Sequence, residues 1–311
     1  GIRALVAGGG REEERLAAQD LGFVVGPRLN AAGRLEDMSL GIRCLLAESE
    51  DEARALASEL DSLNRQRRSL EDAMHGDALA SLADDAGLAD RAGVCLYRED
   101  WHQGVVGLVA SRIKERLHRP VVAFARGEEG QLKGSARSVP GVHIRDCLDY
   151  VATANPDLLS RFGGHAMAAG LSLEPERLDG FERAFDDAVR ALAAPEALTP
   201  TLATDGALTP AEVTLERART LADGGPWGTG FPEPLFQGRF RVQERRVVGD
   251  QHLRLELLPD GGAESVEAIH FRGAPEGDSG SGDELAAAFR LGVNTFRGRT
   301  RLQLIVEERT E

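Results

Sequence analysis

An uninterrupted amphipathic stretch, Glu50–Ala83, constrains the fold of this chain more than any other feature. It contains no proline and a single glycine, Gly76. Apolar residues recur at every third or fourth position and therefore fall on one stripe of a helix; they are Ala53, Leu56, Leu60, Leu63, Leu70, Met74 and Leu82. This spacing predicts one long helix, which either connects two regions of the chain or packs as an ordinary helix.

The residues before this helix predict a short helix followed by a loop. Residues 11–21 have helical character, and Gly22 is expected to end that helix. Residues 26–34 are rich in Gly, Pro and Asn, which predicts an irregular backbone path. In this loop Arg28 and Arg34 could bind phosphate oxygens with both arms of their guanidinium groups, or they could be ordinary surface arginines.

The residues after the long helix alternate between strand and helix patterns, which indicates an α/β sheet domain. The predicted strands are 94–97, 120–125, 133–139 and 166–173, and the predicted helices are 107–117, 144–152 and 178–192. Residues 194–210 are rich in Ala, Thr and Pro and form either a linker or a strand between domains.

The last region, 235–308, changes to short stretches of alternating apolar and polar residues separated by turns. This pattern predicts several strands in a small β-barrel or sandwich. Within it, residues 278–283 are rich in Gly and Ser and are expected to form a flexible surface loop.

Charge is distributed unevenly along the 311 residues, whose formal net charge is −14. Such an acidic chain is not a generic basic nucleic-acid-binding protein. Residues 101–147 are the local exception, with eight basic residues against four acidic ones. One basic face could attract phosphate groups while the rest of the surface keeps the protein soluble. The alternative is a solvated helix face without a ligand.

Several classes of protein are not expected. The longest apolar stretch, 104–110, is much shorter than the roughly 20 residues that span a bilayer, and no leader indicates export. Cys44, Cys95 and Cys147 are widely spaced, which predicts neither a disulfide framework nor a zinc site. Reduced thiols in the cytoplasm are expected instead. The first residue is Gly1 rather than methionine, which suggests a fragment or a processed product.

Residues 101–107, Trp-His-Gln-Gly-Val-Val-Gly, follow a predicted strand and open a predicted helix. This order directs backbone N–H groups and the positive end of a helix dipole towards an anion. The glycines permit close approach of a ligand, and His102 and Gln103 can donate hydrogen bonds. The segment matches neither a P-loop nor a dinucleotide-binding pattern. The alternative is a helix start packed under a buried tryptophan.

A second segment, 133–138, combines small residues with hydrogen-bonding side chains. Ser135, Arg137 and Ser138 could meet one ligand at the end of a strand. The alternative is a sheet edge with an exposed arginine.

A third segment, 162–170, places Gly163 and Gly164 before His165 and a run of small residues. Such a segment permits close packing or close approach of a ligand. A single histidine serves structural and functional roles alike, so both interpretations stay open.

No catalytic centre is visible in the sequence. A hydrolytic metal site needs Asp and His residues close together, whereas the seven histidines are dispersed. No nucleophile elbow and no Cys–His arrangement occurs. The sequence therefore offers groups for binding without a catalytic centre.

In this order, the segments resemble the RecJ family, which are single-stranded-DNA-specific 5′→3′ exonucleases within the DHH phosphoesterases. The segments that carry the resemblance are 26–34, 101–112, 133–138, 162–170, 225–228 with 231–234, and 294–298 with 302–304. Together they extend over essentially the whole chain.

The resemblance implies an α/β plus β fold in five parts. These are a terminal remnant of the catalytic DHH domain (1–47), a long connector helix (48–90), an α/β DHH-associated domain (91–195), a linker (196–233) and an OB-fold β-barrel that binds single-stranded DNA (234–311). The full-length family enzyme uses Mn²⁺ or Mg²⁺, but its metal-binding carboxylates and DHH histidines are absent from this sequence. We therefore expect no catalytic residue and no bound metal in this chain.

The resemblance also implies which residues bind DNA and phosphate. They are Asn30, Arg34, His102, Gln103, Ser135, Arg137, Ser138, Gly163, Gly164 and His165. Asn30 and Arg34 would hold the backbone near the cut, and Arg137 would bind phosphate with the two serines. His102, Gln103 and His165 would line the cleft that faces the metal site.

Aromatic and basic residues of the predicted barrel are the candidates for base stacking and backbone contact. The phenylalanines are Phe236, Phe240, Phe271, Phe289 and Phe296, of which some must belong to the core. The arginines are Arg239, Arg241, Arg245, Arg246, Arg254, Arg297, Arg299 and Arg301. Trp227 is expected to anchor packing instead.

The partners implied by the resemblance are single-stranded DNA, a single-stranded-DNA-binding protein and a recombination helicase, in DNA repair and recombination. The chain alone is expected to bind DNA without cutting it. One alternative is a nucleic-acid-binding module without a nuclease role. Another is the tRNA-binding tail of an alanyl-tRNA-synthetase-like enzyme, which a preference for RNA would identify.

Overall fold

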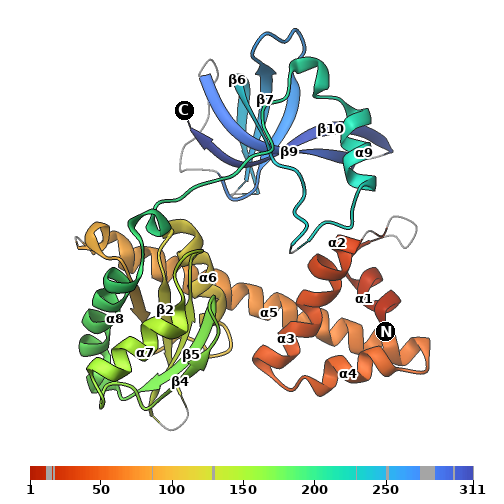
Figure 1. Cartoon of the computed structure of the whole chain (residues 1–311). Coiled ribbons are helices and arrows are strands. Elements are labelled where there is room, and N and C mark those ends of the chain that lie inside the picture. The colour runs from red at the N-terminus through yellow and green to blue at the C-terminus, as the bar shows by residue number, and fades with distance from the viewer. Residues whose placement is uncertain are drawn as a thin grey trace. The chain divides into compact units, whose positions relative to one another are not determined.

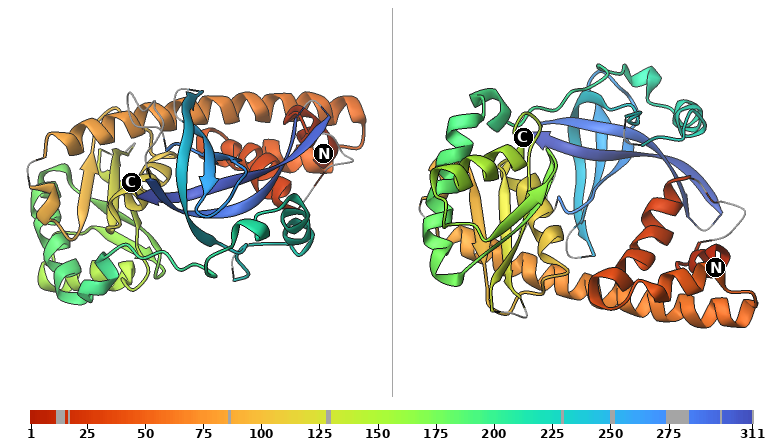
Figure 2. Two further views of the ribbon diagram at one scale, coloured as in Figure 1. Left: turned by 90° about the horizontal axis from the view of Figure 1, so that it is seen from above. Right: turned by 60° about the horizontal axis from the view of Figure 1, so that its bottom comes forward.

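Helix α5 (Glu50–Ala83) confirms the predicted long helix, which has 34 residues. It begins after Ser49, whose hydroxyl accepts a hydrogen bond from the Glu52 N–H. At 1.5 Å per residue, the helix is about 50 Å long. The first half of its apolar stripe packs against the N-terminal helices, and the second half packs against the sheet domain. Figure 2 shows α5 running between these two parts.

The computed structural model describes residues 1–11, 16, 18–85, 87–127, 130–228, 230–249, 252–273, 284–296 and 298–310. The chain divides into two compact units, Gly1–Pro200 and Thr201–Glu311, which are drawn in Figure 1. The loop predicted at 278–283 lies outside the described residues. None of the helices in the described ranges is long and apolar enough to cross a lipid bilayer.

The N-terminal helices pack on the first half of α5. They are α1 (Ile2–Gly8), α2 (Ala18–Asp20), a π-helical turn η2 (Leu21–Val25), α3 (Gly26–Leu35) and α4 (Ser39–Leu46). Of the helix predicted over 11–21, residues 18–20 form α2, and residues 12–15 and 17 lie outside the described part of the chain. Gly22 does not end a helix, so that prediction is wrong.

The irregular loop predicted over 26–34 is also wrong, because these residues form most of α3. Pro27 lies in the first turn of α3, directly after the π-helical turn η2. Ala31 and Ala32 are fully buried in the same core cluster as Leu60 of α5. This packing offsets the poor helix propensity of the Gly, Pro and Asn residues.

A five-stranded mixed sheet forms the α/β domain and confirms its prediction. Its strands are β1 (Val94–Tyr97), β2 (Val121–Arg126), β3 (Leu132–Arg137), β4 (Arg161–Gly164) and β5 (Ala168–Leu173), in the order β1-β2-β3-β5-β4. Strands β1 and β2 are parallel, and the other pairs are antiparallel. The sequence pattern does not predict β4, because its two glycines are turn signals.

Helices cover both faces of this sheet. Val122 and Phe124 of β2 face α7 (Ile144–Ala154) and α8 (Leu178–Leu192). Val121 and Ala123 face α5 and α6 (Val106–Leu117) on the other side. Figure 1 shows the sheet between these helices. This alternation follows from the two-residue period of a strand, and it explains why the β2 segment is apolar throughout.

The second unit contains a closed five-stranded barrel with the order β10-β8-β7-β6-β9. Its strands are β6 (Phe236–Val248), β7 (His252–Pro259), β8 (Val266–His270), β9 (Glu284–Phe296) and β10 (Arg299–Thr310). Strands β8 and β10 pair in parallel, and the other neighbours are antiparallel. A closed barrel with this topology is an OB-fold, so the choice between barrel and sandwich is resolved.

Helix α9 (Leu215–Asp223) packs on the barrel through Ala218, which is fully buried. The sequence pattern assigns these residues to a linker, because so short a helix with one buried residue has little apolar period. Thr214 caps α9 by accepting a hydrogen bond from the Arg217 N–H. Short 3-10 turns lie at Leu88–Asp90, Pro175–Arg177, Pro195–Leu198 and Pro210–Glu212.

Candidate nucleic-acid interface

The C-terminal end of α3 meets the loop that precedes α6. Arg34 donates a hydrogen bond from Nη1 to the carbonyl oxygen of Gly104 at 3.2 Å. A Cβ atom at residue 104 would lie 2.0 Å from the carbonyl oxygen of Arg34. Glycine is therefore required for α3 and this loop to touch, and this contact sets the position of the Arg34 guanidinium.

The end of strand β3 lies against the start of α6. A Cβ atom at Gly107 would be 2.9 Å from an Arg137 Nη atom and 3.5 Å from Ser135 Oγ. Ser135 and Arg137 are two residues apart on a strand, so their side chains leave the same face of the sheet. The N-terminus of α6 therefore lies next to both side chains, with its positive dipole end on that side.

Arg34 and Arg137 form a pair of half-buried cations at this place. Arg137 donates from Nη1 to the carbonyl oxygen of Ala136 at 2.8 Å. Within the described ranges of the chain, neither arginine forms an ion pair with a carboxylate. Burial, and after it the charge of Arg34, lower the pKa of Arg137. Two like charges without a counter-ion beside a helix start favour the binding of an anion.

Three further side chains of the predicted site belong to the same segments: Asn30 lies on α3 with Arg34, and His102 and Gln103 lie in the loop before α6. The Nδ1 atom of His102 accepts a hydrogen bond from the Gly104 N–H at 3.1 Å, so the neutral ring carries its proton on Nε2 and can donate it. Gln103 is exposed. Asn30 is exposed on α3 one turn before Arg34, on the same side of the helix.

The Gly163–Gly164–His165 segment is placed by the sheet register. Gly164 of β4 pairs with Ala169 of β5, while Arg137 of β3 pairs with the adjacent Ala168. These residues therefore share one end of the sheet with Arg137, separated from it by strand β5. Gly164 has φ +152°, and a Cβ atom there would lie 2.4 Å from the Ala169 Cα. This glycine is needed for close strand packing.

Ser138 is placed differently from the other predicted phosphate-binding residues. Its side chain is buried, and its hydroxyl donates to the carbonyl oxygen of Val142 at 2.7 Å. Its backbone N–H donates to Met167 O. These bonds fix the turn after β3, and they leave Ser135 as the accessible serine of the segment.

Arg28, unlike Arg34, has a carboxylate partner. Its Nε donates to Asp61 Oδ1 at 2.9 Å, and its Nη1 donates to Val24 O at 2.8 Å. Because Asp61 belongs to α5, Arg28 ties α3 to the long helix. The two arginines of this segment therefore have different surroundings, and we keep Arg34 as the candidate phosphate ligand.

The structure contains a charged cluster on α5 and α6 that the sequence analysis did not name. Glu71 is buried and forms ion pairs with Arg67 at 2.9 Å and with Arg112 of α6 at 2.6 Å. The four-residue spacing of Arg67 and Glu71 is visible in the sequence as a helical ion pair. The participation of Arg112 depends on the packing of α6 and has no sequence signal.

The barrel divides its phenylalanines between core and surface. Phe240 and Phe289 are buried and pack edge to face with ring centroids 5.4 Å apart. Phe236 packs beside them and is partly buried. Phe271 and Phe296 are 57% and 67% exposed, and the Phe271 ring packs edge to face on His252 with centroids 5.4 Å apart. These two are the phenylalanines of the predicted set that lie at the barrel surface.

Among the predicted barrel arginines, the exposed ones are Arg239, Arg241, Arg246, Arg254, Arg299 and Arg301. Arg245 is buried, and Arg297 lies outside the described residues. Trp227 donates from Nε1 to Leu221 O at 3.0 Å and stacks on Phe231 with centroids 4.7 Å apart. These contacts support its interpretation as a packing residue.

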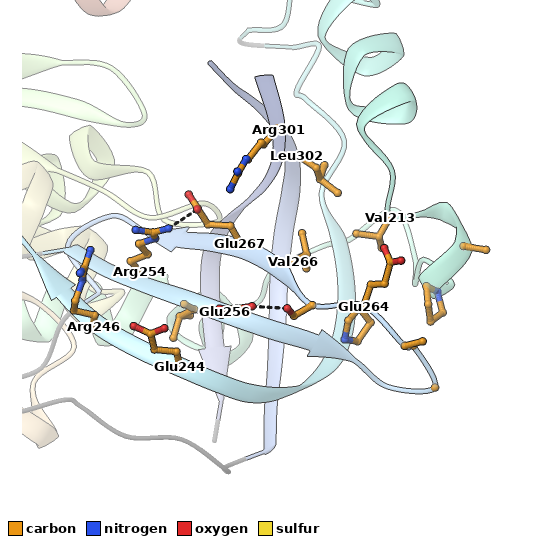
Figure 3. Close-up of a pocket in the computed structure, with 18 residues that line it drawn as sticks. Val213, Glu244, Arg246, Arg254, Glu256, Glu264, Val266, Glu267, Arg301 and Leu302 are labelled. Carbon is orange, nitrogen blue, oxygen red and sulfur yellow. Dashed lines mark hydrogen bonds and ion pairs between the residues drawn. The ribbon is translucent and has the colours of Figure 1, made fainter. Parts of the chain in front are cut away.

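A cavity of about 760 Å³ lies on the barrel, between β7, β8 and residues 210–213. Its charged lining consists of Glu244, Glu256, Glu264, Glu267, Arg246, Arg254 and Arg301. Arg254 pairs with Glu267 at 2.6 Å, and Figure 3 shows their charged groups facing each other. Because the carboxylates outnumber the arginines, this cavity is a poor site for a phosphate backbone.

Two known protein domains match the two units of this chain. The DHHA1 domain matches residues 90–191, and the RecJ OB domain matches residues 204–308. The single-stranded-DNA-specific exonuclease RecJ of Salmonella typhimurium is 47% identical over 311 residues, which cover 99% of this chain and 54% of that protein. The chain belongs to the RecJ family. It spans about half the length of the curated RecJ proteins that it matches.

Solved structures of RecJ share the fold. RecJ of Thermus thermophilus in complex with Mg²⁺ has a TM-score of 0.77 and 29% identity, and the match covers 100% of this chain and 46% of that chain. The Mn²⁺ complex of the same protein has a TM-score of 0.78, with 29% identity, and the match covers 100% of this chain and 44% of the other. The DHH-associated domain and the OB-fold expected from the resemblance are therefore present.

Mg²⁺ and Mn²⁺ in those RecJ structures raise the question of a metal site in this chain. Within the described ranges, no three His, Cys, Asp or Glu side chains lie close enough together to hold a metal ion. Three or more such ligands are the usual requirement for a catalytic metal. The described donor groups therefore do not fit the metal.

Proposed function

We propose that this chain is the part of a RecJ exonuclease that holds single-stranded DNA for 5′→3′ hydrolysis in DNA repair and recombination. The observation that carries the proposal is the pair of half-buried arginines, Arg34 and Arg137, without carboxylate partners beside the start of α6. A guanidinium group matches the geometry of phosphate oxygens, and the start of a helix adds backbone donors.

The barrel supports single-stranded rather than duplex DNA as the ligand. Phe271 and Phe296 are exposed on the barrel, and surface aromatic side chains are the groups on which unpaired bases stack. Bases inside a duplex are paired and stacked on each other, so they are unavailable for such contacts. The RecJ relatives are named as exonucleases specific for single-stranded DNA, and we extend that specificity to this chain.

We assign binding and orientation of the strand to the described residues, and no step of hydrolysis. Arg34, Arg137 and Ser135 would hold phosphate groups through charge-assisted and hydroxyl hydrogen bonds. The Nε2–H of His102 would add a neutral donor at the same place. The three cysteines are free and buried, which supports our further proposal of a cytoplasmic protein.

Fluorescence anisotropy with labelled oligonucleotides across a salt series tests this proposal. The chain is expected to bind a single strand more tightly than a duplex of the same length, with affinity falling as salt rises. Absence of binding at low salt would contradict the proposal. Tighter binding of an RNA hairpin than of single-stranded DNA would favour the alanyl-tRNA-synthetase-like alternative.

We also expect the chain to leave DNA intact in Mn²⁺ or Mg²⁺, because its described residues form no metal site. A 3′-labelled single strand incubated with the chain should keep its length on a sequencing gel, and the chelator EDTA should leave the affinity unchanged. Metal-dependent shortening that co-purifies with the chain, and that is lost in the Arg137→Gln variant, would show catalysis by this chain and refute the prediction.

A further inference from the structure

Arg67 on the long helix is held rigidly but retains free hydrogen-bond donors. Its Nη1 donates to Glu71 at 2.9 Å, and its Nη2 donates to Asn64 Oδ1 at 3.0 Å. Its buried Nε–H has no partner among the described residues. A guanidinium carries five N–H donors, so three of them are unused. Its side chain is 13% exposed; because Nε is buried, the unused donors that remain for a ligand are the two on the Nη atoms.

The position of Arg67 along α5 places it at the end of α3, the helix that carries Arg34. Leu63 packs with the N-terminal helices and Leu70 packs with the sheet domain, so Arg67 lies where α5 passes from one to the other. Leu35, the neighbour of Arg34, packs in the same cluster as Leu70. The end of α3 and this turn of α5 therefore meet at one place.

Positive charge is in excess around Arg67. Its carboxylate partner Glu71 is shared with Arg112, whose second partner is Asp72. Burial lowers the pKa of Arg67, Glu71 opposes this shift, and the charges of Arg68, Arg34 and Arg112 lower the pKa further.

Arg34 links Arg67 to the phosphate-binding pair. The charge of Arg34 lowers the pKa of Arg67 as well as that of Arg137. Helix α3, which carries Arg34, packs on α5, and Leu35 packs in the same cluster as Leu70, one turn after Arg67.

We propose that Arg67 binds a second phosphate of the strand, next to the phosphate held by Arg34 and Arg137. This inference rests on the proposed function. Glu71 and Asn64 already fix the guanidinium, so little side-chain freedom is lost when a phosphate binds. The long helix then takes part in DNA binding directly, in addition to connecting two parts of the chain.

The test compares Arg67→Gln with Arg54→Gln, an exposed arginine of the same helix that carries the same charge change. We expect Arg67→Gln to weaken binding of a single-stranded oligonucleotide about tenfold. The slope of log affinity against log salt should become shallower by about 0.7, the contribution of one phosphate contact on a single strand. Arg54→Gln should keep the wild-type affinity and slope.

The outcomes separate this inference from the proposed function. If Arg137→Gln weakens binding and Arg67→Gln matches Arg54→Gln, the role of Arg67 is refuted while the proposed function stands. If neither Arg137→Gln nor Arg67→Gln has an effect, the proposed function fails as well. Should Arg67→Gln unfold, Arg67→Lys is measured instead. It should keep the wild-type salt slope and lose affinity, because lysine lacks the planar fork; full wild-type affinity would refute the inference.

Discussion

Replacing Arg34 and Arg137 together by glutamine is expected to weaken binding of single-stranded DNA by about 100-fold or more. A hydrogen bond to a charged group contributes about 1.5–3 kcal/mol, and about 1.4 kcal/mol corresponds to a factor of ten in affinity. Two such contacts therefore supply at least two orders of magnitude. Anisotropy with an oligonucleotide labelled at its 3′ end measures the change without blocking the 5′ end.

The single variant Arg137→Gln is expected to unfold at the wild-type temperature or above it. Burial and the charge of Arg34 lower the pKa of Arg137, which means that its charged form is less favourable in the folded state than in the unfolded state. At every pH below that lowered pKa, and hence at neutral pH, this charge opposes folding. Glutamine removes the opposition, so thermal unfolding followed by circular dichroism should show no loss.

Arg116→Gln/Arg145→Gln is the matched control for the Arg34→Gln/Arg137→Gln double variant. Both residues are exposed on helices of the same domain, and the change in net charge is identical. The control should bind DNA within a fewfold of wild type. An equal loss of affinity in both double variants would mean that net charge alone governs binding. A loss of thermal stability in Arg137→Gln would mean that this arginine supports the fold instead.

The sequence names the residues of the candidate site but not the partners that each of them has in the fold. Arg28 and Arg34 lie in one segment, and the sequence alone gives no reason to prefer one of them as a phosphate ligand. The structure distinguishes them only because Asp61 of α5 lies within reach of Arg28 and not of Arg34. Likewise, Ser135 and Ser138 differ because the turn after β3 uses the hydroxyl of Ser138. These differences arise from packing between distant segments, which local spacing does not contain.

The fold shows the same limit. Helix α5 is predictable in full because its apolar period continues for 34 residues and Ser49 provides a cap. Helix α3 is not, because Gly, Pro and Asn favour turns locally, and the burial of Ala31 and Ala32 outweighs that preference. Burial of small residues leaves no periodic signal strong enough to oppose turn-forming neighbours.

Glu71→Gln is expected to lower the free energy of unfolding of the first unit by about 3 kcal/mol, because removing one member of a buried ion pair leaves the other charges uncompensated. Glu71 is the buried carboxylate between Arg67 and Arg112. Asp72→Asn is the matched control, since Asp72 pairs with the same Arg112 but its side chain is 55% exposed. An exposed pair contributes about 1 kcal/mol or less.

Urea unfolding followed by tryptophan fluorescence measures both variants. The chain has two tryptophans, of which Trp101 lies in the core of the first unit and Trp227 lies in the second. In a Trp227→Phe background, Trp101 therefore reports the first unit alone. Equal midpoints for Glu71→Gln and Asp72→Asn would show that Glu71 is not held by its two arginines. A large loss confined to Glu71→Gln would show that the ion cluster fastens α5 to α6. Arg67 and Glu71 belong to α5, and Arg112 belongs to α6.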